Sequence, residues 1–483
     1  MQTNLSRIVF SIVVFAGTFL FSQKVIVPNL LTLEDIKPET QLAQVAQTAS
    51  CTHYASPNGG GNGLSQSSPF QIANFWSVAG PGKTLCLLDG IYTGGNSMIT
   101  PPSGLGGSSG NPITIRALND GSVGINGQSA RQPLKFNNNS WWIVEGVNLY
   151  NGSNNVVEVW TNSNNNIFRR IVAWDAPVTD NAMLFLNGQN TGNLYEDIAG
   201  FGNARKIFEW YNGGASGTVT IRRAWGQFSA NTWSSPGGPK MVYSNMYNSR
   251  NALYENLIGN WDKTSTSPVE DYGLFSGDQI NDGGTHCINH RNYGSIGYIK
   301  ASDNADTLNA YAAAHGWYDQ DCLDFKNLVM YIQPGSHTGI SPFIGDNYQG
   351  GRTYAYLSNV TTISSASPSI AGDWTQSNNS FVSSVAAAPN IWNGAGTSGA
   401  RVCKQYVNGT LTNNPLWPWP MDARIRAAVI ASGRNADAIF GGAGNSVTQQ
   451  MEQKFGAIPA ECRTGGTTVT PAPTVSIAST FQR

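Results

Sequence analysis

The chain has 483 residues, of which only 12% are charged, which is about half the usual share. Its formal net charge is −1, and it has no basic block. This excludes nucleic-acid binding as a main function, because such binding depends on clustered Lys and Arg. Glycine is abundant, with 54 residues, and asparagine is frequent; both tolerate the positive φ of tight bends. The composition is typical of a rigid, exported β protein.

The N-terminal residues predict export. Arg7 precedes an uncharged apolar stretch, Ile8–Phe21, which has the length of a signal-peptide core and is short for a membrane-spanning helix. We expect residues 1–22 to be a signal peptide or an uncleaved N-terminal anchor, and residues 23–50 to be a polar tether. The expected location is extracellular or at the cell surface.

Regular structure is expected to begin at Cys51. The sequence predicts a short helix at Phe70–Val78, a strand at Thr84–Leu88, and two strands around a turn at Asn119–Gly121. A helix at this position would form an N-terminal cap that covers the strand edges of the elements that follow.

Five short motifs in this region occur in a distinctive order. They are Tyr-Ala-Ser-Pro-Asn-Gly, Ser-Pro-Phe, Pro-Gly-Lys-Thr-Leu, Asp-Gly-Ile-Tyr and Pro-Ile-Thr-Ile-Arg-Ala, between residues 54 and 117. This series resembles the opening of right-handed parallel β-helix proteins of the pectate-lyase-like class, whose relatives include alginate and chondroitin lyases. The resemblance implies three parallel sheets per coil. It does not define the chemistry, because the class includes lyases, hydrolases, epimerases and non-catalytic surface proteins. A complete set of the enzymes' catalytic residues in order is not found.

A repeat fills residues 141–332. Each copy is a short apolar segment interrupted by two polar residues, and the first polar residue is in turn Glu145, Arg169, Glu196, Arg222, Glu255, Arg291 and Lys326. Repeats of this size indicate stacked supersecondary units, and Asn/Gly-rich bends between short strands favour a solenoid of parallel strands. We therefore predict an all-β fold, a right-handed parallel β-helix over residues 51–385.

The signs of these residues alternate along the chain. Because neighbouring strands lie ~4.8 Å apart, opposite charges would face each other from coil to coil. Each such pair would contribute about 0.2–1 kcal/mol. We interpret the series as a structural ladder of ion pairs, with a catalytic arginine among them as the alternative.

The repeat stops near Ala386. Residues 386–463 predict a small helical C-terminal cap, with one helix from an Asp422 N-cap to Ala431 and another at Ser446–Phe455. We expect this cap to fold onto the C-terminal end of the solenoid. Within it, Trp417 and Trp419 are interpreted as packing anchors rather than sugar platforms. Residues 464–483 form a Thr/Pro-rich tail.

Six cysteines in an exported chain favour disulfides. Proximity in the sequence suggests the pairs Cys51–Cys86, Cys287–Cys322 and Cys403–Cys462. Free buried thiols are the alternative for any one of these cysteines. A metal–thiolate site is less favoured, because no Cys-x-x-Cys spacing occurs.

An eliminative lyase needs a base that removes the proton beside a uronate carboxylate, and a positive charge that stabilises the enolate. A second recurring strand predicts Lys206 and Lys240 in one column on adjacent coils, with Arg205 beside them. Such a basic column would bind an acidic polysaccharide. The alternative is that these lysines are solvated residues at bends.

Residues 271–291 form a second candidate site, rich in Asp and His. The carboxylates would hold Ca²⁺ through oxygen ligands, and a histidine would act as acid or base; Asp-Gly turns are the structural alternative. Aromatic residues in the neighbouring loops would stack on sugar rings. The candidates are Asp271, Asp278 and Asp282 for metal, His286 and Arg291 for catalysis, and His290, Trp233 and Trp261 for substrate.

Two hypotheses follow. In the first, the chain is a secreted or surface-anchored protein that binds an acidic polysaccharide and cleaves it as an eliminative lyase, with Ca²⁺ as its only expected cofactor. In the second, it is a non-catalytic surface, adhesion or filament-forming protein whose loops bind glycan. In both, the expected partner is a polysaccharide or glycan, and contact with a membrane occurs only through the N-terminal anchor. The sequence leaves the oligomeric state open.

Overall fold

The computed structural model describes residues 50–463 except 178, 180–181, 212–216, 229–240, 247–250, 262–273, 278–286, 301–313, 317–320, 334–342, 346–354, 365–369, 372–373 and 393–397. All of these described residues belong to one compact unit. None of the helices in them is long and apolar enough to cross a membrane.

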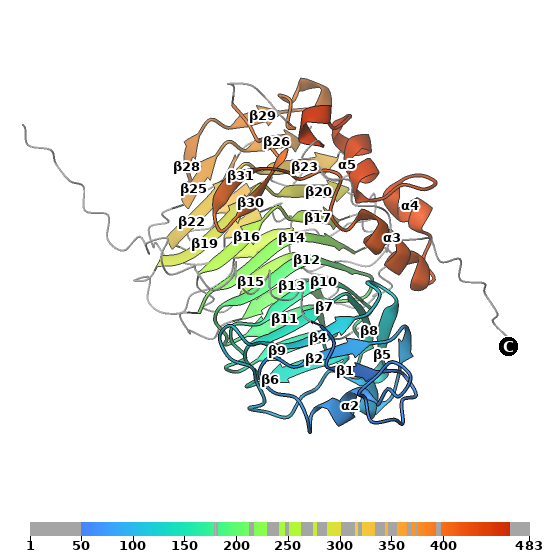
Figure 1. Ribbon diagram of the computed structural model, residues 1–483. Helices are drawn as coiled ribbons and strands as arrows, with labels where there is room; N and C mark the ends of the chain where they lie inside the picture. The colour runs from blue at the N-terminus through green and yellow to red at the C-terminus, as the bar shows by residue number, and fades with distance from the viewer. Residues whose placement is uncertain are drawn as a thin grey trace, which may run out of the picture. The chain divides into compact units, whose positions relative to one another are not determined.

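The described strands stack into three parallel ladders, which confirms the right-handed parallel β-helix (Figure 1). The first ladder contains β1 (His53–Ala55), β2 (Thr84–Leu87), β4 (Ile113–Ala117), β7 (Trp142–Glu145), β16 (Ala252–Glu255), β19 (Cys287–Tyr293), β22 (Asp321–Lys326), β25 (Ala355–Ser358) and β28 (Trp374–Ser377). The second contains β3 (Gly90–Tyr92), β5 (Val123–Arg131), β8 (Val147–Gly152), β17 (Ile258–Trp261), β20 (Ile296–Lys300), β23 (Val329–Gln333), β26 (Thr361–Ser364) and β29 (Ser380–Val382).

Three longer strands run through both of these ladders and join them into one sheet: β10 (Ile167–Trp174), β12 (Asn193–Phe201) and β14 (Val219–Gln227). The third ladder contains β6 (Leu134–Asn137), β9 (Val157–Trp160), β11 (Met183–Gly188), β13 (Lys206–Tyr211), β15 (Met241–Met246), β18 (Phe275–Gly277), β21 (Ala314–Gly316), β24 (Phe343–Gly345) and β27 (Ile370–Ala371). The three parallel sheets implied by the resemblance are therefore present, with the first two merged in the middle coils.

From β7 onward, a sharp bend separates the first ladder from the second in the described coils. It consists of one residue with positive φ, and the successive residues form a column that we call the bend column: Gly146, Arg170, Asp197, Arg223, Asn256, Gly294, Asn327, Asn359 and Asn378. Gly and Asn adopt this conformation readily, whereas other residues do so at a cost. The three charged members are therefore exceptions in this column, and each of them forms an ion pair.

The interior is filled by side chains that stack from coil to coil. In the third ladder the rings of Phe185, Phe208, Tyr243 and Phe275 follow one another with centroid separations of 4.8, 4.8 and 5.2 Å. Because parallel strands place the same pleat position directly above its neighbour, one aromatic position in the repeat becomes a continuous stack.

The turn between the third and first ladders contains a buried amide ladder. Asn166 is fully buried; its Oδ1 accepts a hydrogen bond from the Trp142 amide at 2.9 Å, and its Nδ2 donates to the Asn139 carbonyl at 3.0 Å. The Asn166 amide in turn donates to Asn193 Oδ1 at 2.8 Å. Each asparagine thus satisfies backbone groups that the turn would otherwise leave buried without a partner.

The N-terminal helix is shorter than predicted. Only Ile72–Phe75 is helical (α2), and the 3-10 helix η2 (Gly95–Ser97) follows β3. Residues of the loop before α2 cover the outer edge of β1: the Ser56 amide donates to the Phe70 carbonyl at 3.0 Å, and the Phe70 amide donates to the Tyr54 carbonyl at 3.1 Å. The first strand of the solenoid is therefore protected from edge pairing.

The C-terminal segment begins with the 3-10 helix η3 (Val385–Ala387) and the antiparallel hairpin of β30 (Lys404–Val407) and β31 (Thr410–Pro415). It continues with α3 (Asp422–Ala431), α4 (Ala436–Phe440), α5 (Val447–Phe455) and the 3-10 helix η4 (Ala460–Cys462). The two expected helices are present; Met421 is the N-cap of α3, and α5 begins with a capping box between Ser446 and Gln449. The hairpin and α4 were not predicted. Trp417 and Trp419 are buried, as expected of packing anchors.

The position of this cap differs from the prediction. It runs back along the outside of the second ladder toward the N-terminal coils instead of covering only the C-terminal end (Figure 1). Arg434 lies over the Phe201 ring and pairs with Asp175 at 2.6 Å, and Arg424 reaches Asp120 at 3.2 Å. The cap packs against a stack of aromatic rings on the second ladder: Tyr150, Trp174 and Phe201.

Two of the three expected disulfides are present, Cys51–Cys86 and Cys403–Cys462. The side chains of Cys287 and Cys322 lie outside the described part of the chain.

The amide ladder gives a stability prediction. Replacing Asn166 by Ala removes the partners of a buried backbone amide and a buried carbonyl, so we expect the free energy of unfolding to fall by about 2–4 kcal/mol. Denaturant titration of Asn166→Ala and wild type measures the difference. Asn137→Ala is the control because Asn137 is exposed at the end of β6; equal effects of the two substitutions would contradict the role of the ladder.

Candidate functional site: a charged cleft

The outward charges of the first ladder form one continuous row. Arg116, Glu145, Arg169, Glu196, Arg222 and Glu255 are direct neighbours on successive strands, and we call them the axial charge row. The predicted alternation of signs is therefore correct over these coils. Arg116 was missed, although it follows an apolar Ile-Thr-Ile segment like those of the other repeats.

The next coil corrects the prediction. Tyr293, not Arg291, lies opposite Glu255, and Lys326 lies opposite Tyr293. Arg291 is two residues away, between Leu253 and Asp324 on the neighbouring strands. The repeat in this coil has a different internal spacing, so alignment by the nearest polar residue selected the wrong one.

Close ion pairs connect the members of the row. Arg169 binds Glu145 at 2.6 Å, and Arg222 lies 3.2 Å from Glu196 and 2.7 Å from Glu255. Because these side chains are largely buried, solvent screens their attraction less than it would on an open surface. The row therefore holds its guanidinium groups in fixed positions.

The charged residues of the bend column form a second row beside the first. Arg223 binds Asp197 at 2.6 Å and also Glu196 at 2.8 Å, and Arg170 pairs with Asp120. These pairs hold Arg170, Asp197 and Arg223 in positive-φ conformations that Asn or Gly adopts in other coils. The two rows run side by side along the axis of the solenoid.

The charges stabilise each other's ionised forms. Burial alone would raise the pKa of Glu196, but Arg223, Arg222 and Arg169 outweigh it and hold this pKa below its ordinary value. Burial alone would lower the pKa of Arg222, yet Glu255 and Glu196 raise it above its ordinary value. Both shifts favour the charged forms of Glu196 and Arg222.

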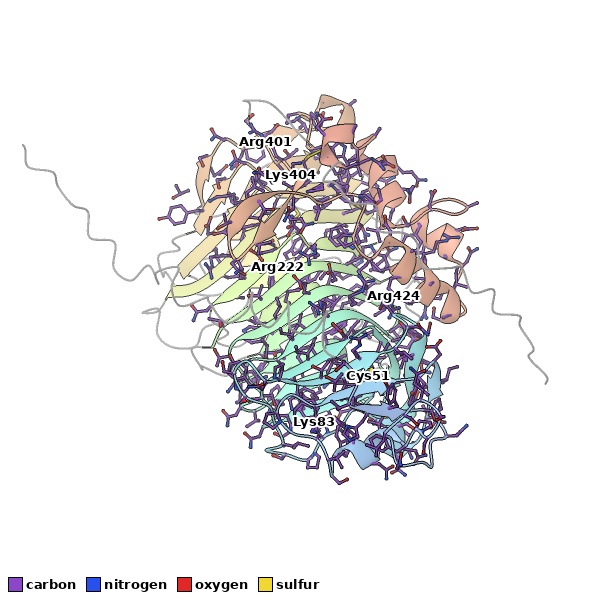
Figure 2. The ribbon with its side chains drawn as sticks, in the orientation of Figure 1. Cys51, Lys83, Arg222, Arg401, Lys404 and Arg424 are labelled. Carbon is purple, nitrogen blue, oxygen red and sulfur yellow. A yellow bond between two sulfur atoms is a disulfide. The ribbon has the colours of Figure 1, made fainter. Side chains whose placement is uncertain are left out.

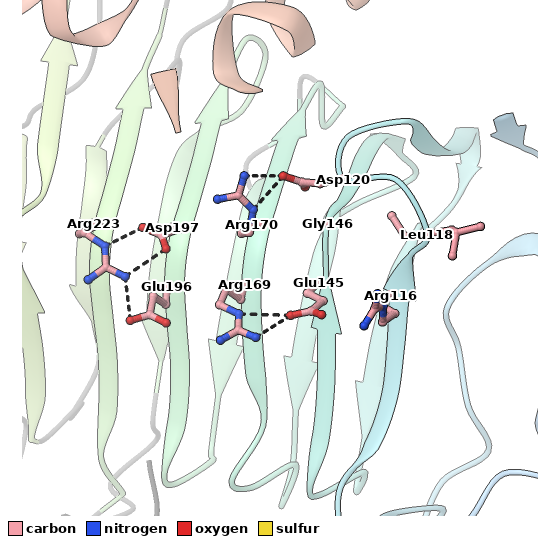
Figure 3. A pocket seen from close by; sticks show the side chains of 11 residues that line it. Arg116, Leu118, Asp120, Glu145, Gly146, Arg169, Arg170, Glu196, Asp197 and Arg223 are labelled. Carbon is pink, nitrogen blue, oxygen red and sulfur yellow. Dashed lines mark hydrogen bonds and ion pairs between the residues drawn. The ribbon is translucent and has the colours of Figure 1, made fainter. Parts of the chain in front are cut away.

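Between Arg116 and Arg223, the two rows line a cleft of about 390 Å³ (Figure 3). Its lining includes four arginines, Arg116, Arg169, Arg170 and Arg223, and four acids, Asp120, Glu145, Glu196 and Asp197. The side chains of Arg170 and Asp120 are the accessible pair, each 36% exposed. Arg170 donates hydrogen bonds to Asp120 from Nε and Nη2. Its Nη1 makes no hydrogen bond to the described residues.

This arrangement is suited to binding a ligand through donors and acceptors held in fixed positions. A guanidinium group presents a planar fork of donors that matches a carboxylate, and it stays protonated in proteins. The carboxylates between the arginines are acceptors for hydroxyl groups. The cleft thus offers alternating donors and acceptors of fixed charge.

Lys206 lies outside the charged cleft. It is 5% exposed, and its Nζ lies 2.9 Å from Glu209 Oε1. Met241, not Lys240, lies opposite it on the next strand, so the predicted column of two lysines is wrong by one residue. Arg205 is partly buried and directly precedes β13.

Two predicted sugar-binding residues belong to the core. Trp261 is 2% exposed and packs against Phe228. His290 is fully buried, with its ring edge-on to Tyr254 and Phe325. Neither side chain is accessible to a polysaccharide, and the alternation of inward and outward positions in a strand explains this.

The remaining candidates lie outside the described residues: Lys240, His286, Trp233, Asp271, Asp278 and Asp282. In the part of the chain that is described, no group of three or more His, Cys, Asp or Glu residues is arranged to hold a metal ion. Arg291 is described but partly buried and outside the cleft.

His290 gives a prediction about pH. Burial lowers its pKa to about 3, with a further contribution from Arg291. The unfolded chain therefore binds a proton near pH 6.5 that the folded chain does not. Stability is full above this pH, and we expect it to fall by about 1.4 kcal/mol per pH unit from pH 6.5 toward pH 3.

The test compares wild type with His290→Phe by denaturant titration across this range. The variant removes the titrating group and keeps an aromatic ring in the core, so its stability should depend less steeply on pH. Parallel slopes for the two proteins would show that His290 is not buried in its neutral form.

Comparison with known proteins adds only a fold-level likeness. No family model matches the sequence, and no curated protein matches it. Among solved structures, pectate lyase Pel9A is 16% identical, with 73% of this chain and 83% of that chain covered and a TM-score of 0.41. A rhamnogalacturonan lyase is 13% identical over 68% of this chain and 88% of its own, with a TM-score of 0.45. An alginate lyase from Paenibacillus sp. str. FPU-7 is 11% identical over 64% and 94%, with a TM-score of 0.38. Because these values are low, the fold assignment rests on the strand pairing of this chain itself.

Proposed function

We propose that this chain is an exported β-helix protein that binds a uronate-containing polysaccharide in the charged cleft. The observation that carries the proposal is the double row of ion-paired arginines and carboxylates, open between Arg116 and Arg223 and fixed by the stacking of the coils. The scaffold is rigid, so a bound glycan would meet groups that are already oriented.

The charge pattern favours a polymer that carries both carboxylates and hydroxyls. Arg170 has an unused donor at the surface of the cleft, where it would bind a uronate carboxylate. Asp120 and the row carboxylates would accept hydrogen bonds from sugar hydroxyls. With four cations and four anions in its lining, the cleft has no strong net charge, so recognition would depend on geometry more than on long-range attraction.

Export is part of this proposal. Two disulfides in the described residues fit an oxidising environment, and the apolar segment Ile8–Phe21 would direct the chain there.

The binding proposal predicts a specific role for Arg170. We expect Arg170→Asn to weaken binding of a polyuronate about tenfold to a hundredfold, because a charge-assisted hydrogen bond is lost. Asn tolerates the positive φ of this position, as it does at Asn256 and Asn327 in the same column, so the bend is kept. Titration calorimetry at two salt concentrations measures the loss.

Lys135→Gln is the matched control. Lys135 forms a surface pair with Glu158 at 3.0 Å on the third ladder, outside the cleft, and its substitution changes the net charge by the same amount. Equal loss of affinity in both variants would reduce the effect to overall charge and contradict a specific site.

Cleavage of the polysaccharide is a separate proposal. It would use Lys240 or His286 as the base, with Ca²⁺ held by Asp271, Asp278 and Asp282, and none of these lies in the described part of the chain. The arginines of the cleft would then bind the substrate without abstracting its proton.

This division of roles predicts how activity responds to substitution. Wild type should form an unsaturated product, which is detected by its ultraviolet absorbance with and without Ca²⁺. This product should be lost in whichever of the variants Lys240→Ala and His286→Ala removes the base. Arg170→Asn should raise KM and leave kcat nearly unchanged, because it removes ground-state binding. A loss of kcat in Arg170→Asn at saturating polymer would place the chemistry in the cleft instead.

A further inference from the structure

The hairpin β30–β31 crosses the charged rows at the end of the cleft. Its tip is formed by Asn408 and Gly409, whose φ values of 52° and 76° are those of a two-residue Asn-Gly turn. The hairpin comes from the segment that follows the last described coil (Figure 1).

The tip binds the charges that would continue the cleft. Arg222 Nη2 donates to Asn408 Oδ1 at 2.6 Å, and the Gly409 amide donates to Glu255 Oε1 at 2.6 Å. In the bend column, Arg223 Nη1 donates to Gln405 Oε1 at 3.1 Å. The cleft lining ends at Arg223, at the point where these contacts begin.

The hairpin is held firmly behind its tip. Tyr406 is 3% exposed, packs against Tyr293, and its amide donates to Asn256 Oδ1 at 2.6 Å. Asn327 donates a hydrogen bond to the Tyr406 hydroxyl. The Cys403–Cys462 disulfide fixes the base of the hairpin, and Lys404 Nζ donates to the Glu461 carbonyl at 3.2 Å (Figure 2).

These contacts cover the charged residues at one end of the cleft. Without the hairpin, the axial charge row would continue past this point along the solenoid. A polymer lying along the axial charge row toward higher coils would have to displace two charge-assisted hydrogen bonds and a buried tyrosine. A bound chain would therefore stop at the hairpin.

We propose that the β30–β31 hairpin is an end wall that makes the cleft select a terminus of the polysaccharide rather than an internal segment. This inference rests on the proposed function, because it specifies how the same cleft binds its ligand. The hairpin residues that set the specificity are Gln405, Asn408 and Gly409.

The test measures how many protein molecules bind one polyuronate chain. Chains of two defined lengths are titrated with the full chain of the protein, and stoichiometry is determined by analytical ultracentrifugation. An end-selective cleft binds one protein per chain at both lengths. An open cleft binds in proportion to length, so doubling the chain length doubles the number of proteins bound.

The matching variant removes the wall. The Leu416 amide donates to the Cys403 carbonyl at 2.9 Å, so residues 404–415 can be replaced by a short Gly-Asn-Gly turn that joins neighbouring positions. We expect this variant to bind in proportion to chain length. If it does not fold, the double variant Gln405→Ala/Asn408→Ala retains Tyr406 and loosens the tip, and it should bind more proteins per long chain than wild type does. Thr410→Ala, an exposed position on the same hairpin, is the control and should match wild type.

The outcomes separate the two proposals. Length-dependent stoichiometry of the wild type, with Arg170→Asn still weakened, overturns the end wall and leaves the binding function in place. Absence of binding to every chain by wild type and variants overturns the proposed function and the end wall with it.

Discussion

Parallel register is the constraint on which this structure depends. In a stack of parallel strands every position of the repeat lies directly above the same position in the coil below. Any residue type that recurs in the repeat therefore becomes a continuous row. The buried amides, the aromatic stacks and the axial charge row are three results of the same geometry, and only their chemistry differs.

The charge row shows how stability and function are combined. Like charges stacked in register would repel, so alternating signs favour the packing of these coils. The resulting network fixes several protonated arginines in place, which suits the proposed recognition of an anionic sugar. The alternation of charge that favours folding thus also determines which donors and acceptors line the cleft.

The C-terminal segment decides where the row is accessible. Its helices lie on the aromatic residues that face outward from the second ladder, and its hairpin lies on the charges of the first ladder and the bend column. The solenoid by itself would expose the row over most of its length. Packing of a non-repeating segment against the repeats converts a long charged surface into a short cleft with an end wall.

The repeat was readable from the sequence because it depends on local pattern. Apolar segments with two polar residues at fixed intervals identify stacked coils, and they placed Glu145, Arg169, Glu196, Arg222 and Glu255 correctly in one row. The same reasoning failed at two places where the coil spacing changes by one or two residues: Tyr293, not Arg291, lies opposite Glu255, and Met241 lies opposite Lys206. It also failed for His290 and Trp261, because a polar or aromatic residue in a strand faces the core or the solvent according to a register that only the fold sets.

The sequence by itself therefore determined the class of fold, the alternation of charge from Glu145 to Glu255 and two helices of the C-terminal segment, since these follow from residue type and spacing. Only the tertiary structure decided the site. Arg223 and Gln405 are 182 residues apart in the chain and meet at the end of the cleft. No local pattern encodes such a contact, because it forms only when two segments far apart in the chain pack against each other.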